Sequence, residues 1–193
     1  ILEKEFSGTS LRIVQADILH VRFDDILPVD ISFVIAGNFP YNISSQIVFL
    51  GLQLRHRVPF MAGMFQKEMA ERICSDPGSK AFGVISVLVQ AYYNTSLLFT
   101  VKPGSFAPPP KVQSAVISLT RYRHEIEGVP YNVLRQVVKM AFSQRRKKIR
   151  NTLKSLIPEE TLKELALVDL RPEQLTVDQF ITLARIVATS PAI

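Results

Sequence analysis

The chain has 193 residues, of which 47% are hydrophobic and 21% are charged, and its formal net charge is +6. This composition indicates a folded globular protein rather than a disordered chain, and no apolar run approaches the roughly 20 residues that a membrane-spanning helix needs. A single cysteine excludes an internal disulfide and suits a reducing cytoplasm. With only three scattered histidines beside it, we expect no metal site.

The first ninety residues predict an alternation of strands and helices. The expected strands cover residues 11–17, 31–37 and 59–65. The expected helices cover residues 1–6, 44–57, 66–73 and 82–93. The first helix should end at Ser7-Gly8, and Ser44 or Ser45 should cap the second. The nearly continuous apolar character of residues 31–37 is typical of a parallel strand that is covered on both faces.

Two further strands, over residues 95–101 and 112–119, should flank a Pro-rich loop at residues 103–110. They follow the β-α alternation and would form an antiparallel pair. The sequence therefore predicts an α/β fold whose mostly parallel sheet has a reversed edge.

The pattern becomes helical beyond residue 133. Three short helices are expected over residues 133–156, 158–165 and 176–189. We therefore place a domain boundary near Gly128, which gives a sheet domain of residues 1–128 and a small helical domain of residues 129–193.

The positive charge is concentrated in this helical part. Residues 1–129 hold 12 basic and 11 acidic residues, whereas residues 130–193 hold 11 and 6. A basic part beside a near-neutral one favours a polyanionic partner such as nucleic acid. The alternative is an ordinary solvated surface.

A polar and aromatic stretch, Asn38-Phe39-Pro40-Tyr41, follows the apolar strand expected at 31–37. Ligands of open α/β sheets bind beyond the carboxyl ends of the strands. The Asn38 amide and the Pro40 carbonyl can present two acceptors side by side on a stiff turn, and the Tyr41 ring can stack on a base. The pattern favours a pocket for a flipped adenine held by its amino edge. The alternative is a turn capped by Asn38, with Tyr41 as packing.

Five motifs, in order along the whole chain, resemble the bacterial small-subunit ribosomal RNA adenine dimethyltransferases (KsgA type). They are NFPYNIS, FQKEMAERI, FGVISVLVQAYYN, SFAPPPKVQSAV and FSQRRKKIRNTLK, and the tail LRPEQLTVDQFITLAR also fits. The resemblance implies a Rossmann-like class I methyltransferase sheet with a small C-terminal helical domain. It also implies a cytoplasmic, monomeric enzyme that uses S-adenosylmethionine to dimethylate N6 of two adjacent adenosines near the 3′ end of the rRNA, as part of 30S subunit maturation.

The resemblance assigns roles to individual residues. The implied catalytic set is Asn38, Pro40, Tyr41 and Phe106. The amide and carbonyl of the first two would accept hydrogen bonds from the target amine, and the two aromatic rings would close on the base. Asp17, together with Asn38, would bind the cofactor, with the Asp17 carboxylate accepting a hydrogen bond from its adenine. Lys111 would meet an RNA phosphate or remain solvated.

A second basic cluster lies in the helix expected at 133–156. Its members are Arg145, Arg146, Lys147, Lys148 and Arg150. Ile149 and Leu153, four residues apart, are expected to anchor this segment to the helical domain. The five cations would then be free to bind rRNA phosphates, and the alternative is solvated charge.

Two features depart from the family pattern. Gln113 stands where the family usually has Asp, so no carboxylate can act there. None of the eight glycines forms the Gly-x-Gly-x-Gly loop of the cofactor site. We therefore expect a truncated chain whose sheet is incomplete at its N-terminal side. Either residues 11–17 move to pair with residues 31–37, or the exposed strand edge is covered by self-association with another chain.

Two other functions remain open from the sequence. One is a non-catalytic RNA-binding or ribosome assembly factor on the same fold, and the other is a large-subunit rRNA adenine methyltransferase. The intact stretch from Asn38 to Tyr41, together with Phe106, favours an enzyme because a simple binding module has no need of an amine-gripping pocket. The basic segment and the tail favour the small-subunit enzyme.

The missing glycine loop leads to a first prediction. The 193-residue chain alone should bind S-adenosylmethionine weakly or not at all, and should therefore be inactive by itself. Isothermal titration calorimetry of the purified chain measures this directly, and tight binding would contradict the expectation.

Overall fold

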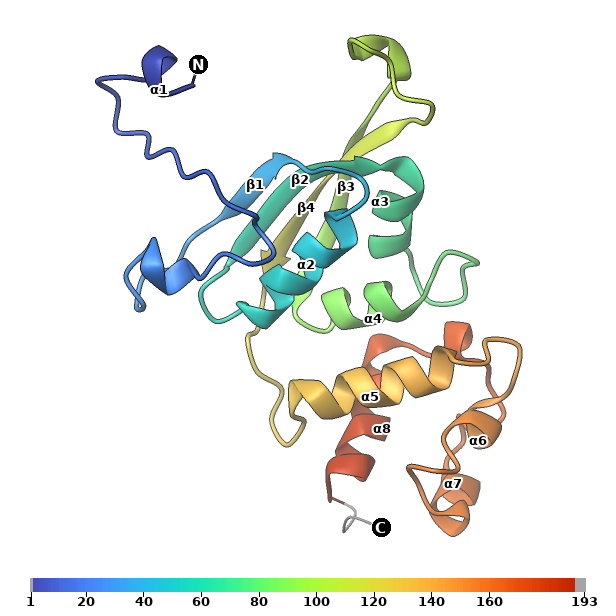
Figure 1. Ribbon diagram of the computed structural model, residues 1–193. Coiled ribbons are helices and arrows are strands. Elements are labelled where there is room, and N and C mark those ends of the chain that lie inside the picture. The colour runs from blue at the N-terminus through green and yellow to red at the C-terminus, as the bar shows by residue number, and fades with distance from the viewer. Residues whose placement is uncertain (1, 190–193) are drawn as a thin grey trace. The chain divides into compact units, whose positions relative to one another are not determined.

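The computed structural model describes residues 2–189 and divides the chain into two compact units, Ile1–Ile31 and Ser32–Ile193 (Figure 1). No helix within residues 2–189 combines the length and the apolar character needed to cross a membrane.

The first unit holds one α-helix, α1 (Leu2–Glu5), and one 3-10 turn, η1 (Phe23–Asp25). Gly8, with φ +83°, follows the helix, as the sequence predicted. The strand expected at 11–17 is wrong: this segment is irregular, and the chain turns at Asp17, whose carbonyl accepts hydrogen bonds from two later amides. A strand needs a hydrogen-bonded neighbour, and the described residues of this unit provide none. The proposed pairing of residues 11–17 with residues 31–37 is therefore also wrong.

A four-stranded mixed sheet forms the centre of the second unit, in the order β1-β2-β4-β3. The strands are β1 (Ile35–Asn38), β2 (Phe60–Gln66), β3 (Tyr93–Val101) and β4 (Ser114–Arg121). β1 and β2 are parallel, and β4 is antiparallel to both β2 and β3. The reversed strand is thus β4, inside the sheet, and not the edge strand that the sequence predicted. A long β3–β4 hairpin carries the Pro-rich loop at its tip (Figure 1).

Three helices join the strands of this sheet. They are α2 (Ser44–Gln53), α3 (Lys67–Ile73) and α4 (Val84–Gln90), and each is shorter than its predicted helix. α2 lies across one face of the sheet (Figure 1), and Gly51 allows it to approach β2, because a Cβ there would lie 2.3 Å from the sulfur of Met61. The predicted N-cap is wrong: Ile43 occupies that position, since the Ser44 hydroxyl donates to the Tyr41 carbonyl instead.

Four helices follow the sheet, where three were expected. They are α5 (Tyr131–Phe142), α6 (Ile149–Thr152), α7 (Glu159–Glu164) and α8 (Val177–Thr189), with a 3-10 turn, η3 (Pro172–Gln174), before the last. The single helix predicted over residues 133–156 is wrong, because residues 143–148 form turns. The Ile149 and Arg150 amides donate to the carbonyls of Leu170 and Val168 rather than to the preceding helical turn.

The helices pack on each other and on α4 through aromatic side chains. Phe142 of α5 stacks on Phe180 of α8 at 5.7 Å between ring centroids and lies 6.4 Å from Phe82, just before α4. Arg55, after α2, lies over the rings of Tyr92 and Tyr131 at 4.8 and 5.1 Å. The helical part therefore shares packing with the sheet part, and a boundary between residues 128 and 129 remains a proposal.

Candidate active site and nucleic-acid interface

Phe39 is the only residue of the stretch Asn38–Tyr41 that turns fully into the core. It is 8% exposed, and its ring meets that of Phe65 edge-on at 5.3 Å. A glycine is required opposite: a Cβ on Gly63 would lie 2.2 Å from the Phe39 ring and 2.9 Å from a backbone oxygen. With Phe39 inside, the flanking Asn38 and Pro40 are exposed. Burial of one ring thus directs both predicted acceptor residues outward.

The turn that follows is held by its own backbone. The Ile43 amide donates to the Pro40 carbonyl at 3.1 Å, and the Ser44 hydroxyl donates to the Tyr41 carbonyl at 3.0 Å. A carbonyl oxygen has two lone pairs, so the Pro40 oxygen retains the capacity to accept one more hydrogen bond. The Tyr41 ring is half-buried, and its hydroxyl shares a hydrogen bond with that of Ser114 at 2.5 Å.

The four predicted catalytic residues line one cavity of about 330 Å³. The lining consists of Asn38, Phe39, Pro40, Tyr41, Phe106, Pro108 and Pro110. The first four are the last residue of β1 and the three residues that follow it, and the last three come from the Pro-rich loop between β3 and β4, more than sixty residues later. The cavity is at the small end of the ~300–1,000 Å³ range of ligand pockets and is mostly apolar, with few polar groups. It suits a flat aromatic group whose edge carries hydrogen-bond donors.

Gln113 and Lys67 meet at the base of the Pro-rich loop. The Lys67 amide donates to the Gln113 carbonyl at 2.9 Å, and the Lys67 ammonium donates to its amide oxygen at 3.2 Å. The ammonium also lies 3.8 Å from Glu71. The acceptor for the Lys67 ammonium is therefore a neutral amide oxygen, at a position where the family usually has a carboxylate. No role for Lys67 could be predicted from the sequence, because its partner lies 46 residues away.

Asp17 belongs to the first unit, where it closes a turn rather than a strand. Its carboxylate accepts a hydrogen bond from the Leu19 amide at 2.9 Å and pairs with His20 at 2.8 Å. The Leu19 amide, followed by the His20 ring, lowers the pKa of Asp17 below its ordinary value. The side chain is exposed and ionised at neutral pH, and its remaining lone pairs can accept further hydrogen bonds.

Three of the five basic residues in the predicted RNA-binding segment contact carboxylates. Lys148 and Arg150 lie 3.1 and 3.2 Å from the same oxygen of Asp169, and hydrogen bonding to Lys148, followed by the charge of Arg150, lowers the pKa of Asp169. Arg145 lies 3.9 Å from Glu173 and donates to the Ser79 carbonyl at 3.4 Å.

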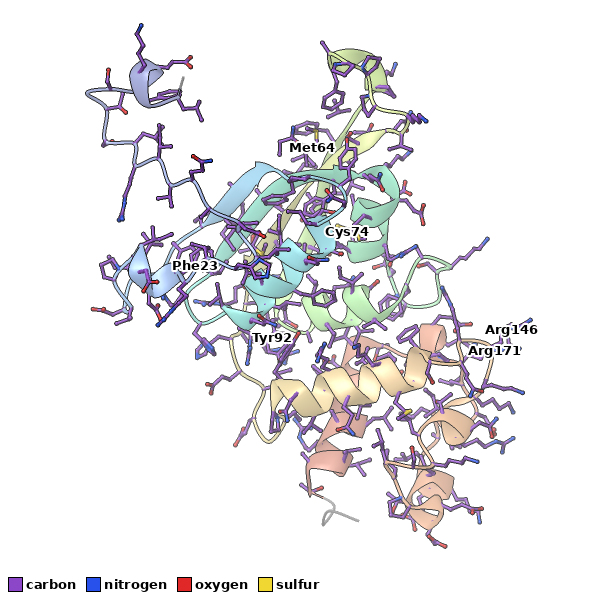
Figure 2. All side chains as sticks on the ribbon, in the orientation of Figure 1. Phe23, Met64, Cys74, Tyr92, Arg146 and Arg171 are labelled. Carbon is purple, nitrogen blue, oxygen red and sulfur yellow. The ribbon has the colours of Figure 1, made fainter. Side chains whose placement is uncertain are left out.

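The remaining two cations, Arg146 and Lys147, form no ion pair with any residue between 2 and 189, and the same holds for Lys111 in the Pro-rich loop. The sequence did not single out Arg171, which the pairing of Ile149 with Leu170 brings to the same segment. Figure 2 shows the Arg146 and Arg171 side chains extending outward at the same edge of the view. Arg146, Lys147 and Arg171 form the exposed basic group of the helical part.

The packing of Phe39 leads to a prediction. Gly63→Ala should destabilise the fold by about 1–3 kcal/mol, because the new methyl group must displace the Phe39 ring or the backbone. Urea unfolding followed by circular dichroism measures the loss. Gly104→Ala in the Pro-rich loop is the matched control, since a Cβ there meets nothing within 4 Å. Equal stability of the two variants would contradict the constraint at Gly63.

Comparison with known proteins places the chain in a family. The family model described as "Ribosomal RNA adenine dimethylase" matches residues 1–189. "Ribosomal RNA small subunit methyltransferase A" of Flavobacterium johnsoniae is 48% identical over 174 residues, which cover 90% of this chain and 66% of that protein. The protein of the same name from Porphyromonas gingivalis is 44% identical over 183 residues, with coverages of 94% and 71%. The chain thus spans about two thirds of the length of these relatives.

Solved structures support the same fold. A dimethyladenosine transferase from Plasmodium falciparum matches with a TM-score of 0.79 at 22% identity, over 94% of this chain and 74% of that one. The 23S rRNA methyltransferase ErmE matches with a TM-score of 0.65, also at 22% identity, over 96% and 76%. The prediction of a Rossmann-like α/β sheet followed by helices is confirmed. From its sequence and its fold, the chain belongs to the ribosomal RNA adenine dimethylase family.

Proposed function

We propose that the protein containing this chain transfers methyl groups from S-adenosylmethionine to N6 of two adjacent adenosines near the 3′ end of small-subunit rRNA, in the cytoplasm, during maturation of the 30S subunit. The observation that carries the proposal is the shared cavity of Asn38, Pro40, Tyr41 and Phe106 in a chain of the adenine dimethylase family. Relatives that are 42–50% identical are named for the small subunit, which favours this substrate over large-subunit rRNA.

The pocket residues address the weakness of the nucleophile. The lone pair of an adenine amine is conjugated with the ring, so the nitrogen attacks poorly. Hydrogen bonds from the amine to the Asn38 amide oxygen and to the free lone pair of the Pro40 carbonyl would direct that lone pair out of the ring plane. Tyr41 and Phe106 would hold the base by stacking, worth ~1–3 kcal/mol for each ring contact. Catalysis then rests on positioning and preorganised electrostatics.

Two residues have side chains whose chemistry suits contacts with the cofactor. When bound, S-adenosylmethionine supplies an electrophilic methyl group on a sulfonium sulfur. Its amino groups need acceptors, and the ionised Asp17 carboxylate and the exposed Asn38 amide have that chemistry. We propose that Asp17 accepts a hydrogen bond from the adenine amine of the cofactor, and that Asn38 contacts the cofactor beside the target base.

The basic residues would bind the rRNA backbone. Arg146, Lys147 and Arg171 carry charge that no described carboxylate neutralises, so they are the first candidates for phosphate contacts. Lys148 and Arg150 share Asp169, and an exposed ion pair of this kind is weak. A phosphate that binds Lys148 or Arg150 would therefore have to compete with the Asp169 carboxylate. Lys111 follows the Pro-rich lining of the pocket and would contact a phosphate near the target base.

Methylation in cells tests the proposal. The gene that carries this chain would be expressed in bacteria that lack their own dimethylase, and dimethyladenosine in nuclease fragments of the rRNA would be measured by mass spectrometry. Small-subunit rRNA should become dimethylated, and Asn38→Ala should lower the rate about a hundredfold, as for loss of a preorganised polar group. Asn42→Ala, an exposed asparagine of the same turn outside the cavity lining, should retain activity.

Each other result identifies a different function. Dimethylation confined to large-subunit rRNA would contradict the proposed substrate. An absence of methylation despite binding of the protein to small-subunit RNA would contradict the enzyme and leave the non-catalytic assembly factor.

The division between unpaired and paired cations leads to a further prediction, in which two sets of substitutions change RNA affinity in opposite directions. Replacing Arg146, Lys147 and Arg171 together with Ala should weaken binding to a hairpin from the 3′ end of small-subunit rRNA. The fall of log K with log salt concentration should also become less steep, and its negative slope should shrink in magnitude by about two. Asp169→Asn should strengthen binding, because it releases Lys148 and Arg150. Fluorescence anisotropy at several salt concentrations measures both, and an unchanged slope in both variants would remove this group from the interface.

A further inference from the structure

Tyr41 is fixed at both ends by buried serines. The Ser44 hydroxyl holds its carbonyl at 3.0 Å, and the Ser114 hydroxyl holds its phenol at 2.5 Å. Ser44 is 2% exposed and Ser114 is fully buried. These are two of the four serine and threonine residues that are buried between residues 2 and 189. Half of the buried serines and threonines in the described part of the chain therefore contact one tyrosine.

The bond to Ser114 spans the sheet. Asn38, the last residue of β1, pairs with Met64 of β2, whereas Ser114, the first residue of β4, pairs with Gln66 at the end of β2. β2 lies between the other two strands. The turn after β1 and the Tyr41 side chain together must therefore pass the carboxyl end of β2 to reach β4. A ring held in this way has its position determined by two strands that are not neighbours.

The hydroxyl groups of Tyr41 and Ser114 are not required for packing. Phenylalanine and alanine at these two positions would occupy nearly the same shape, and replacing both partners of a buried hydrogen bond with apolar groups is often nearly neutral for stability. What the bond adds is direction, because a phenol without a partner can tilt and rotate within the open cavity. Since the bond occupies the Tyr41 hydroxyl, the ring face is what remains for a ligand.

We propose that Ser114 is a positioning residue of the base pocket: its hydroxyl holds the Tyr41 ring in the orientation on which the target adenine stacks. The inference rests on the proposed function, since it assumes that the cavity receives a base. Ser114 touches neither the base nor the cofactor and acts only through Tyr41. Loss of its hydroxyl should weaken base binding roughly two- to tenfold, the penalty expected for immobilising one side chain during binding rather than beforehand.

The first experiment measures the stability of the protein in the absence of RNA. Urea unfolding of Ser114→Ala, Tyr41→Phe and the double variant forms a double-mutant cycle. Each single variant leaves one buried hydroxyl without a partner and should unfold at lower urea than the wild type. The double variant should unfold at no lower urea than the less stable single variant. Effects that simply add would show that the two hydroxyls are not coupled and would overturn the proposal.

The second experiment measures stacking in the same four proteins. The probe is a short single-stranded RNA with one 8-vinyladenosine, a fluorescent base that keeps its N6 amine and is quenched on stacking. Ser114→Ala and Tyr41→Phe should each weaken binding of the probe two- to tenfold, and the double variant no further. Ser114→Thr, which keeps a hydroxyl, should restore affinity. Ser118→Ala, four residues along β4 and outside the cavity lining, should bind like the wild type.

The outcomes separate the two claims. If the wild-type protein quenches the probe but Ser114→Ala binds it equally well, Ser114 is only structural and the inference fails while the proposed function stands. If neither the wild type nor any variant quenches the probe, the base pocket itself fails, and the inference fails with it. Additive losses of affinity in the double variant would likewise overturn the coupling.

Discussion

The pocket depends on the burial of one aromatic ring. Phe39 fits against the bare backbone of Gly63 and the edge of Phe65, and this contact determines which way the chain faces as it leaves β1. Since the side chains of successive residues at a strand end point to opposite sides, Asn38 and Pro40 on either side of the ring are exposed. The polar chemistry of the site is thus a consequence of an apolar contact below it. A side chain that filled Gly63 would disturb the site without touching it.

The rim of the pocket is built from two segments that are distant in sequence and tied together at one strand end. Gln113 receives Lys67 from α3, and Ser114 receives Tyr41 from the turn before α2. Gln113, the residue before β4, and Ser114, its first residue, therefore bind two different segments that join strands of the sheet. The Pro-rich loop that carries Phe106 leaves from this fixed base. These hydrogen bonds explain how a Pro-rich loop with only a short 3-10 turn, η2 (Pro103–Ser105), can face the residues after β1.

The sequence predicted those features that depend on local pattern or on the family motifs. The apolar runs of β1 and β2 and the hairpin of β3 and β4 follow from composition, and the gathering of Asn38 and Phe106 follows from the resemblance. The failures have one physical cause, because each depended on a partner elsewhere in the chain. Residues 11–17 have a strand's composition but no neighbouring strand, and the Ser44 hydroxyl donates to the Tyr41 carbonyl instead of accepting from an amide of its own helix. Residues 143–148 have helical composition, but the chain straightens at Lys148 because the next amides bond to the 168–170 segment.

The return of β4 between β2 and β3 has a consequence for how the site comes into being. Tyr41 and its partner Ser114 are separated by 73 positions, so the aromatic platform cannot be completed while the chain between them is still being synthesised. Contacts of such long range form late, after the entropy of closing the intervening loop has been overcome. A nascent chain that has exposed its acceptors but not yet its last strand would hold an unfinished pocket. Completion of this pocket therefore coincides with completion of the sheet.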